Sequence, residues 1–285
     1  MILDTHQHFW RLDRGDYHWM TPELSVLYRD YLPADLRPNL RKAGVSRTVL
    51  VQAAQTVAET EFLLDLAAST DFVAGVVGWF DMERDDFPEQ LARYRANRHL
   101  LGIRPMLHDT EDDAWILRPT VLKNLAHLAE VKFPFEFLTY PRHLPHVIEA
   151  LKRTPGLHAV VDHLSKPPIA SGEMEPWKSL LAEVASYENI FCKISGMVTE
   201  ADPHSWSPAD LRPCIEHVYN IFGEDRVMFG SDWPVCLLAA SYAEVCNALR
   251  VVLDEQLSAA QMAKLYGGNG LRFYSLGTAQ DENDA

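Results

Sequence analysis

Eight short runs of apolar and β-branched residues recur along the chain and constrain its fold more than any other feature. They lie near residues 1–5, 48–52, 73–80, 101–106, 133–138, 158–161, 190–194 and 227–230. Several of these runs are apolar almost throughout, which is typical of strands that are covered on both faces, as in a parallel sheet. Each run is followed by a segment long enough for a helix. The pattern therefore predicts repeated strand–helix units.

The intervening segments carry helix signals of their own. Residues 57–68 place apolar side chains at helical spacing, and Ser207-Pro208 offers a cap followed by a proline in the first turn. Ser258 and Gln261 match a capping box, which predicts a helix that begins beside them. We expect Gly267-Gly268 to end that helix.

Eight strand–helix units in about 250 residues are the number found in a (β/α)8 TIM barrel. A doubly wound open sheet is the main alternative, but no glycine-rich phosphate loop follows the first strand. The 285 residues are 47% hydrophobic, so one large core can form, and no linker suggests a domain boundary. We therefore predict an α/β protein with a single barrel domain over residues 1–276. The polar, acidic residues 277–285 are expected to form a disordered tail.

One connection is too long for the simple repeat. Residues 9–33 follow the first strand, and long connections inside a compact domain are usually functional loops. The segment is rich in aromatic side chains, namely Phe9, Trp10, Tyr17, Trp19, Tyr28 and Tyr31. It is predicted to be either a binding loop or an aromatic plug that closes one end of the barrel.

Charge and composition limit the class of ligand. The formal net charge of −14 opposes nucleic acid and anionic membrane surfaces, and favours a small neutral substrate. The first residues do not resemble a signal peptide, and no segment approaches the roughly 20 apolar residues of a membrane span. The four cysteines include no Cys-x-x-Cys pair, so free thiols and a cytoplasmic location are expected. The sequence carries no signal for an oligomeric state.

The sharpest local motif is His6-Gln7-His8, directly after the first apolar strand. Alternate residues of a strand point to the same face, so both imidazoles can project into the mouth of the barrel. Active sites of this fold lie there. Two imidazoles at this spacing suit a divalent metal or a hydrogen-bonded water.

Two further candidates follow later strands. His163 comes after the sixth apolar run, and Asp232 lies in Gly230-Ser231-Asp232-Trp233-Pro234 after the eighth. The alternative, structural roles are a core histidine for His163 and a carboxylate that caps the next helix for Asp232. Because the first and eighth strands are neighbours in a closed barrel, Asp232 is expected to share one site with the two histidines of the first strand.

Two cations lie at or within strands of the same set. Arg104 ends the fourth strand and Lys193 lies within the seventh, so either could stabilise an oxyanion or bind a carboxylate product. Each could instead be a buried partner of a structural acid such as Asp81 or Glu136. Trp79 and Glu136, on the third and fifth strands, are weaker candidates for binding substrate.

With these residues in view, the chain resembles the amidohydrolase superfamily. Within it, the chain is similar to a branch of metal-sparing enzymes for L-fucono-, L-rhamnono- and pyrone-dicarboxylate lactones. The segments that carry the resemblance are residues 4–10, 102–104, 162–163, 193–196, 230–234 and 268–274. The resemblance implies a catalytic centre made of His6, His8 and Asp232, with His163 beside them.

The chain departs from the binuclear members of that superfamily. Its fourth strand ends in Arg104-Pro105 where those members carry a bridging lysine or glutamate, and its fifth strand contains no histidine. A two-metal site is therefore not expected. His6, His8, His163 and Asp232 could hold one zinc ion with an open position. Since the lactonase branch includes members that work without metal, no cofactor is taken as strictly required.

The resemblance implies hydrolysis of a sugar lactone, such as L-fuconolactone, to the sugar acid. Asp232 would take a proton from a water placed by the histidines, while Arg104, Lys193 or His163 stabilised the oxyanion. The aromatic loop, with Trp10, suits stacking against a sugar ring. Two alternatives remain, namely a metal-dependent decarboxylase of an aromatic acid on the same barrel and a non-catalytic protein that binds sugar acids.

Overall fold

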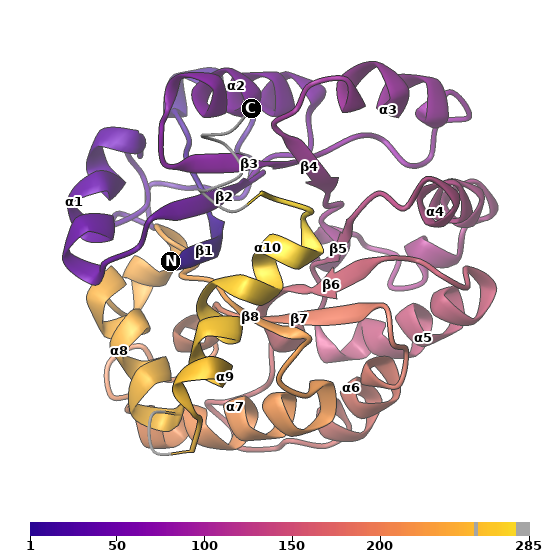
Figure 1. Ribbon diagram of the computed structural model, residues 1–285. Helices are drawn as coiled ribbons and strands as arrows, with labels where there is room; N and C mark the ends of the chain where they lie inside the picture. The colour runs from indigo at the N-terminus through magenta and orange to yellow at the C-terminus, as the bar shows by residue number, and fades with distance from the viewer. Residues whose placement is uncertain (254–255, 278–285) are drawn as a thin grey trace.

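Eight parallel strands form the centre of the molecule and pair in sequence order from β1 to β8 (Figure 1). The computed structural model describes residues 1–253 and 256–277. The eight predicted strands are confirmed, and their bounds shift by a few residues. The strands are β1 Leu3–Gln7, β2 Arg47–Val51, β3 Val73–Gly78, β4 Leu100–Ile103, β5 Phe135–Phe137, β6 Ala159–Val161, β7 Ile190–Ile194 and β8 Val227–Phe229.

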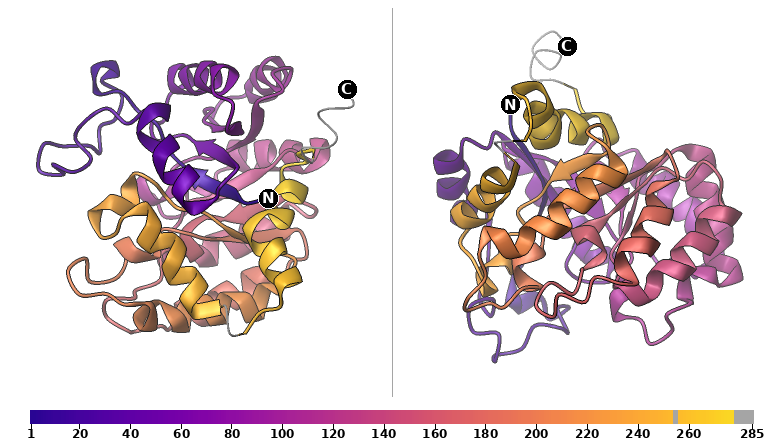
Figure 2. Two further views of the ribbon diagram at one scale, coloured as in Figure 1. Left: turned by 60° about the vertical axis from the view of Figure 1, so that its left-hand side comes forward. Right: turned by 90° about the horizontal axis from the view of Figure 1, so that it is seen from below.

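Helices surround the strands on the outside, as the views in Figure 2 show. They are α1 Pro33–Ala43, α2 Val57–Ser69, α3 Phe87–Arg95, α4 Pro119–Val131, α5 Leu144–Arg153, α6 Trp177–Ala185, α7 Pro208–Phe222, α8 Tyr242–Leu253, α9 Ala259–Ala263 and α10 Asn269–Phe273. Almost every strand residue is buried, as expected for a sheet filled by side chains inside and covered by helices outside. The predicted single (β/α)8 barrel is confirmed.

The capping signals explain where several helices begin. Thr56 accepts a hydrogen bond from the backbone N–H of Glu59 at the start of α2, and Ser258 accepts one from Gln261 at the start of α9. The predicted stop at Gly267-Gly268 is wrong, because a π-helical turn over Lys264–Gly268 leads directly into α10. A Cβ on Gly267 would lie 2.7 Å from the carbonyl oxygen of Met1, so this glycine permits close packing on β1 rather than a helix end.

The first and last strands lie side by side, as predicted, and a parallel bridge between Gln7 and Trp233 joins the end of β1 to the segment after β8. Beyond the strand ends, the backbone N–H of His8 donates to the carbonyl oxygen of Trp233 at 2.7 Å. The N–H of Asp232 donates to the carbonyl oxygen of His6 at 2.8 Å. The residues of the predicted site are therefore themselves part of the closure.

The long connection after β1 packs mainly as an aromatic plug. Phe9, Trp10 and Tyr31 are buried, and the ring of Trp10 contacts those of Trp19 and Tyr31 edge to face. Tyr31 in turn packs on Trp233, which follows β8. The plug therefore braces both strands that carry the predicted site, and Trp19 also reaches the pocket described below.

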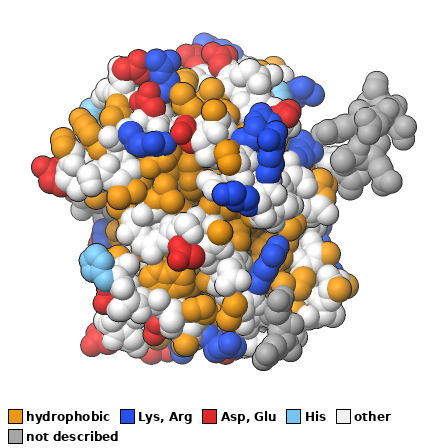
Figure 3. Space-filling model, turned by 90° about the vertical axis from the view of Figure 1, so that its left-hand side faces the viewer, with side chains coloured by type: hydrophobic (Ala, Val, Ile, Leu, Met, Phe, Trp, Pro, Cys, Tyr) orange, Lys and Arg blue, Asp and Glu red, His pale blue; other side chains and the backbone are white. Residues whose placement is uncertain are grey.

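The surface carries both signs of charge. Figure 3 shows hydrophobic side chains gathered near the middle of the face that carries α1 and α8, with acidic and basic groups around them.

All four cysteines are free thiols and are buried. Among the described residues, no helix combines the length and apolar character that a membrane crossing requires. Of the predicted tail, residues 278–285 lie outside the described residues.

Candidate active site

A small pocket opens among the loops that follow the strands. Its volume is about 160 Å³. It is lined by His8, Trp19, Ala53, Arg104, Met106, His108, Asp109, Leu138, His163, Lys166, Asp232 and Val235. The lining combines convergent polar groups with an apolar wall, as is typical of sites for small molecules. Four of the predicted site residues, Arg104, His8, His163 and Asp232, are among them.

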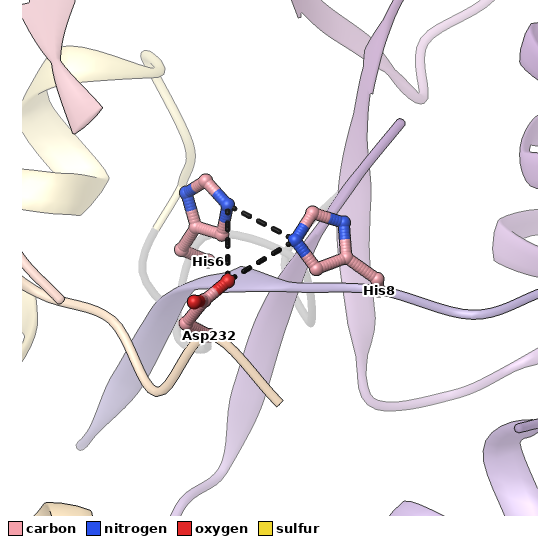
Figure 4. Close-up of side chains that lie close together, drawn as sticks. All are labelled: His6, His8 and Asp232. Carbon is pink, nitrogen blue, oxygen red and sulfur yellow. Dashed lines mark hydrogen bonds and ion pairs between the residues drawn. The ribbon is translucent and has the colours of Figure 1, made fainter. Parts of the chain in front are cut away.

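His6, His8 and Asp232 come together at this pocket, as Figure 4 shows. The Nε2 atoms of the two histidines are 3.2 Å apart. Asp232 Oδ1 lies 3.3 Å from Nε2 of His8 and 3.8 Å from Nε2 of His6. More than two hundred residues separate His8 from Asp232 in the sequence, but the two side chains meet because β1 and β8 are neighbours.

Local backbone geometry aims the carboxylate of Asp232 at the histidines. Asp232 has a φ of 57°, in the left-handed region that few residues other than glycine tolerate. The preceding N–H, of Ser231, donates to the buried carboxylate of Asp4 at 2.8 Å. The hydroxyl of Tyr242 donates to the other oxygen of Asp4 at 3.0 Å. Asp4 therefore holds the turn that bears Asp232.

The hydrogen bond at the far side of His8 determines which ring nitrogen faces the site. His8 Nδ1 lies 2.8 Å from the carbonyl oxygen of Val51, and a carbonyl oxygen only accepts, so Nδ1 carries the proton. In the neutral ring, Nε2 then presents a lone pair toward Asp232 and His6. Three electron-rich atoms can thus converge, an arrangement that a divalent cation or an added proton stabilises.

These three atoms fit a metal ion. Ligands about 2.1 Å from a tetrahedral zinc lie about 3.4 Å from one another, and the three separations here are 3.2, 3.3 and 3.8 Å. Among the described residues, His6, His8 and Asp232 form one group of mutually close ligand atoms, and His6, Asp162 and His163 form another. His163 Nε2 lies 3.8 Å from Asp232 Oδ1, at the edge of the first group.

His163 lies on an unusual turn. Residues 163–166 all have φ between 50° and 58°, and this left-handed turn places both His163 and Lys166 at the pocket. His163 Nδ1 is 2.8 Å from the hydroxyl of Ser195, which fixes the ring orientation. A Cβ on Gly196 would come within 2.6 Å of the His163 ring, so this position requires glycine.

Arg104 reaches the centre of the site from β4. Its Nη1 lies 3.3 Å from His6 Nε2 and 3.3 Å from Asp162 Oδ2, and its Nη2 donates to the carbonyl oxygen of Gln52. The guanidinium is therefore both buried and held at its two ends. Its position beside the histidine pair suits stabilisation of a nearby oxyanion.

Lys193 and Glu136, predicted to bind substrate, lie beneath the pocket rather than in its lining. Both side chains are fully buried. Lys193 Nζ donates to Glu136 Oε2 at 2.5 Å. It forms an ion pair with Asp162 Oδ1 at 3.1 Å and lies 3.3 Å from His6 Nδ1. These contacts agree with the alternative interpretation of the sequence, in which Lys193 is the buried partner of an acid.

The two tryptophans predicted to contact substrate also lie elsewhere. Trp10 is fully buried and its indole N–H donates to the carbonyl oxygen of Arg29. Trp79 lines a separate cavity beside the pocket, and Met106 borders both. Trp19, which the sequence placed only in the aromatic loop, is the tryptophan that lines the pocket.

Asp162 and Lys166 lie at the site, although the sequence analysis assigned neither of them a role there. Asp162 is fully buried and pairs with Arg104 and Lys193. Its position directly before His163, at the end of an apolar strand, was a usable signal. Lys166 lines the pocket and donates to Glu200 at 2.6 Å. Only the left-handed turn brings Lys166 there, and that turn has no clear sequence signature.

Burial and charge set the protonation of the site. Burial lowers the pKa of His6 and of His163 well below 6.5, so neither is an imidazolium at neutral pH. Burial raises the pKa of Asp162, but the charges of Lys193 and Arg104 outweigh it and the pKa falls well below its usual value. Burial also raises the pKa of Asp232, but nearby positive charge that includes Lys166 outweighs it, and the pKa falls below its usual value. Both carboxyl groups are therefore ionised.

Comparisons with known proteins agree with this geometry. The family model described as amidohydrolase matches residues 3–276. The chain is 41% identical to an L-fucono-1,5-lactonase of Burkholderia ambifaria, over 96% of this chain and 95% of that one. It is 37% identical to an L-fucono-1,5-lactonase of Burkholderia multivorans, over 96% of each chain. A crystal structure of an amidohydrolase from Burkholderia multivorans with bound zinc has 36% identity and a TM-score of 0.93, covering 97% of this chain and all of that one.

Proposed function

Because this chain belongs to the amidohydrolase family, we propose that it is a lactonase that opens L-fucono-1,5-lactone, or a similar aldonolactone, to the sugar acid. The observation that carries this proposal is the convergence of two histidines and an ionised aspartate at a pocket of about 160 Å³. The identity to two L-fucono-1,5-lactonases over nearly the full chain supports the same substrate class.

Asp232 is the base of the proposed reaction. Its carboxylate takes a proton from a water molecule, whose oxygen forms a bond to the lactone carbonyl carbon. The bond between that carbon and the ring oxygen then breaks, and Asp232 returns the proton to the departing alkoxide. The lowered pKa of Asp232 keeps it ionised for the first step. His8 Nε2, 3.3 Å away, presents a lone pair and does not occupy the carboxylate with a hydrogen bond.

Arg104 is the proposed group that stabilises the oxyanion. A preorganised donor in a dry site stabilises charge that develops in the transition state more than it stabilises the ground state. The Arg104 side chain is 3% exposed and already paired, so little reorganisation is needed. His163, on the other side of Asp232, is neutral and can donate only from the nitrogen that bears its proton.

His6, His8 and Asp232, with His163 nearby, are the residues that would hold a single divalent metal. When bound, such an ion polarises a carbonyl or lowers the pKa of water. A lactone is an activated ester, which makes a strong Lewis acid less necessary than for an amide. We propose that the metal assists the reaction but is not required for it.

Lys166 is a proposed contact for the sugar hydroxyls or the carboxylate of the product. One of its N–H groups is held by Glu200, and the residue is part of the pocket lining. We expect Lys166→Met to raise KM about tenfold, since a hydrogen bond from a charged group contributes about 1.5–3 kcal/mol, and to change kcat less. Steady-state kinetics would measure both constants. Lys152→Met, at an exposed lysine on α5, is the matched control; an unchanged KM in Lys166→Met would remove this contact.

Titration at constant pH tests the proposed reaction. We expect acid release from L-fucono-1,5-lactone, and slower release from other aldonolactones, with at least half of the rate remaining after chelation. Release that chelation abolishes would make the metal essential. Absence of release from every lactone would refute the proposed function. Carbon dioxide released from an aromatic acid would instead identify the decarboxylase, and saturable binding without turnover would identify the binding protein.

A further inference from the structure

A second and larger cavity adjoins the candidate active site. Its volume is about 610 Å³. After β4, Arg104 lines the catalytic pocket, Pro105 lines the second cavity and Met106 lines both. After β2, Ala53 lines the catalytic pocket and Gln55 lines the second cavity. Two chain segments therefore run from one cavity to the other, and Met106 is a wall that they share.

The sizes of the two cavities differ in a way that bears on the ligand. Sites for small molecules usually measure about 300–1,000 Å³. The catalytic pocket, of about 160 Å³, is smaller than this range, whereas the second cavity lies within it. A ligand with a single small ring fits the catalytic pocket alone. A larger ligand would extend past Met106 into the second cavity.

Trp79 presents an aromatic ring to this second cavity. The side chain is partly exposed, and the hydrogen bonds of the residue join its backbone to Thr60. Among the described residues, its indole N–H has no hydrogen-bond partner and its ring packs on no other aromatic ring. The face of an indole attracts the polarised C–H groups of a sugar ring, and its N–H can donate to a hydroxyl. Trp79 is thus available to stack on a ligand.

Trp115 lines the same cavity and is held firmly in place. Its indole N–H donates to Glu83 Oε1. Arg118 Nη1 donates to both oxygens of Glu83 at 2.8 Å, and Arg118 Nη2 donates to Asp112 Oδ2 at 3.0 Å. These contacts fix one wall of the cavity, so little ordering is needed when a ligand binds.

The charge of the lining limits the class of ligand. Four carboxylates, those of Asp81, Glu83, Glu111 and Asp112, face one guanidinium, that of Arg118. Asp81 and Glu111 form no ion pair within the part of the chain that the structure describes. The excess of negative charge opposes an anion such as phosphate or a sugar acid. Carboxylates accept hydrogen bonds from hydroxyl groups, so an uncharged sugar suits the cavity.

We propose that the second cavity is a subsite for an uncharged sugar unit, and that the enzyme accepts aldonolactones that carry a second sugar on one hydroxyl. The lactone ring occupies the catalytic pocket, and the second sugar stacks on Trp79. The substrate class rests on the proposed lactonase function, but the binding of a neutral sugar by the cavity does not.

Steady-state kinetics with matched substrates test the substrate class. The parent is L-fucono-1,5-lactone, and its partners are the same lactone with a β-D-galactosyl group on each free hydroxyl in turn. For at least one partner we expect KM to be about tenfold lower than for the parent, because the second sugar adds contacts. In Trp79→Ala this ratio should fall to about one. The matched control is Trp206→Ala, at a partly exposed tryptophan outside both cavities, which should keep the ratio of the wild type.

Calorimetry with neutral glycosides tests the subsite without any lactone. We expect saturable binding of methyl β-D-galactoside or methyl α-L-fucoside, at least about tenfold weaker in Trp79→Ala and unchanged in Trp206→Ala. Should Trp79→Ala fail to fold, Glu111→Trp replaces it, since a bulky side chain at this exposed position narrows the cavity.

The outcomes separate this proposal from the proposed function. Hydrolysis of the parent lactone with no gain from any galactosyl group, or with an equal gain in Trp79→Ala, would overturn the subsite alone. Binding of Ca²⁺ but of neither glycoside would overturn it as well. Glycoside binding that depends on Trp79, in a protein that opens no lactone, would support the subsite and refute the proposed function alone.

Discussion

Replacement of Asp232 by asparagine is expected to lower kcat for lactone hydrolysis by about 10³-fold, within the range for loss of a general base. Asparagine has nearly the same shape but cannot take a proton from water at neutral pH. The residue is 3% exposed and lies within 3.8 Å of three histidines, so the change acts on the chemistry at the centre of the site. Titration of acid release gives kcat and KM, and calorimetry with the sugar acid gives product affinity.

Product affinity should change by less than about tenfold in this variant, because the other groups that line the pocket remain. Asp65→Asn, at an exposed position on α2, serves as the control for a general effect of charge. If Asp232→Asn retained more than a tenth of the wild-type kcat, another group would have to be the base. A protein in which product binding was also lost would point to a distorted pocket.

The second large effect is expected for Arg104→Met. Loss of one oxyanion donor costs about 10²–10³ in kcat, and we expect a fall in that range with a smaller change in KM. Methionine preserves much of the length and apolar volume of the arginine stem. The substitution also removes a partner from buried Asp162 at 3.3 Å, so thermal unfolding should occur at a lower temperature.

Arg104→Lys separates charge from geometry. Lysine keeps the charge but lacks the planar fork with which Arg104 contacts Gln52, Asp162 and the histidine pair at once. Its kcat should fall between those of the wild type and Arg104→Met. Arg118→Met, at an arginine 43% exposed on the surface, should leave kcat unchanged. Equal activity of wild type and Arg104→Met would exclude Arg104 from the transition state.

Much of the fold could be predicted because each strand is recognisable in the sequence as a short apolar run. A strand buried on both faces must be apolar along its whole length, and the interval between runs left room for one helix each. The pairing of His6 and His8 followed from the two-residue period of a strand. The contact of both with Asp232 followed from barrel closure, which no local pattern reveals but which the number of strands implies.

What could not be predicted depends on the direction and depth of side chains. Lys193 and Glu136 occupy strands that lead toward the site, but their side chains lie below the pocket and pair with each other. Trp10 is turned into the plug, whereas Trp19, nine residues further on, reaches the pocket. The π-helical turn before α10 resembles a helix end in sequence because glycines permit both. Only the contact of Gly267 with Met1 distinguishes them.

The hydrogen bonds between the segments after β1 and β8 have a consequence for biosynthesis. His6 and His8 leave the ribosome among the first residues, but the carboxylate that completes their site follows more than two hundred positions later. A nascent or truncated chain that stops short of β8 carries both imidazoles without their acid partner. Activity should therefore arise abruptly, only when the last strand docks beside the first, and every shortened product of synthesis or proteolysis upstream of that strand should be inert.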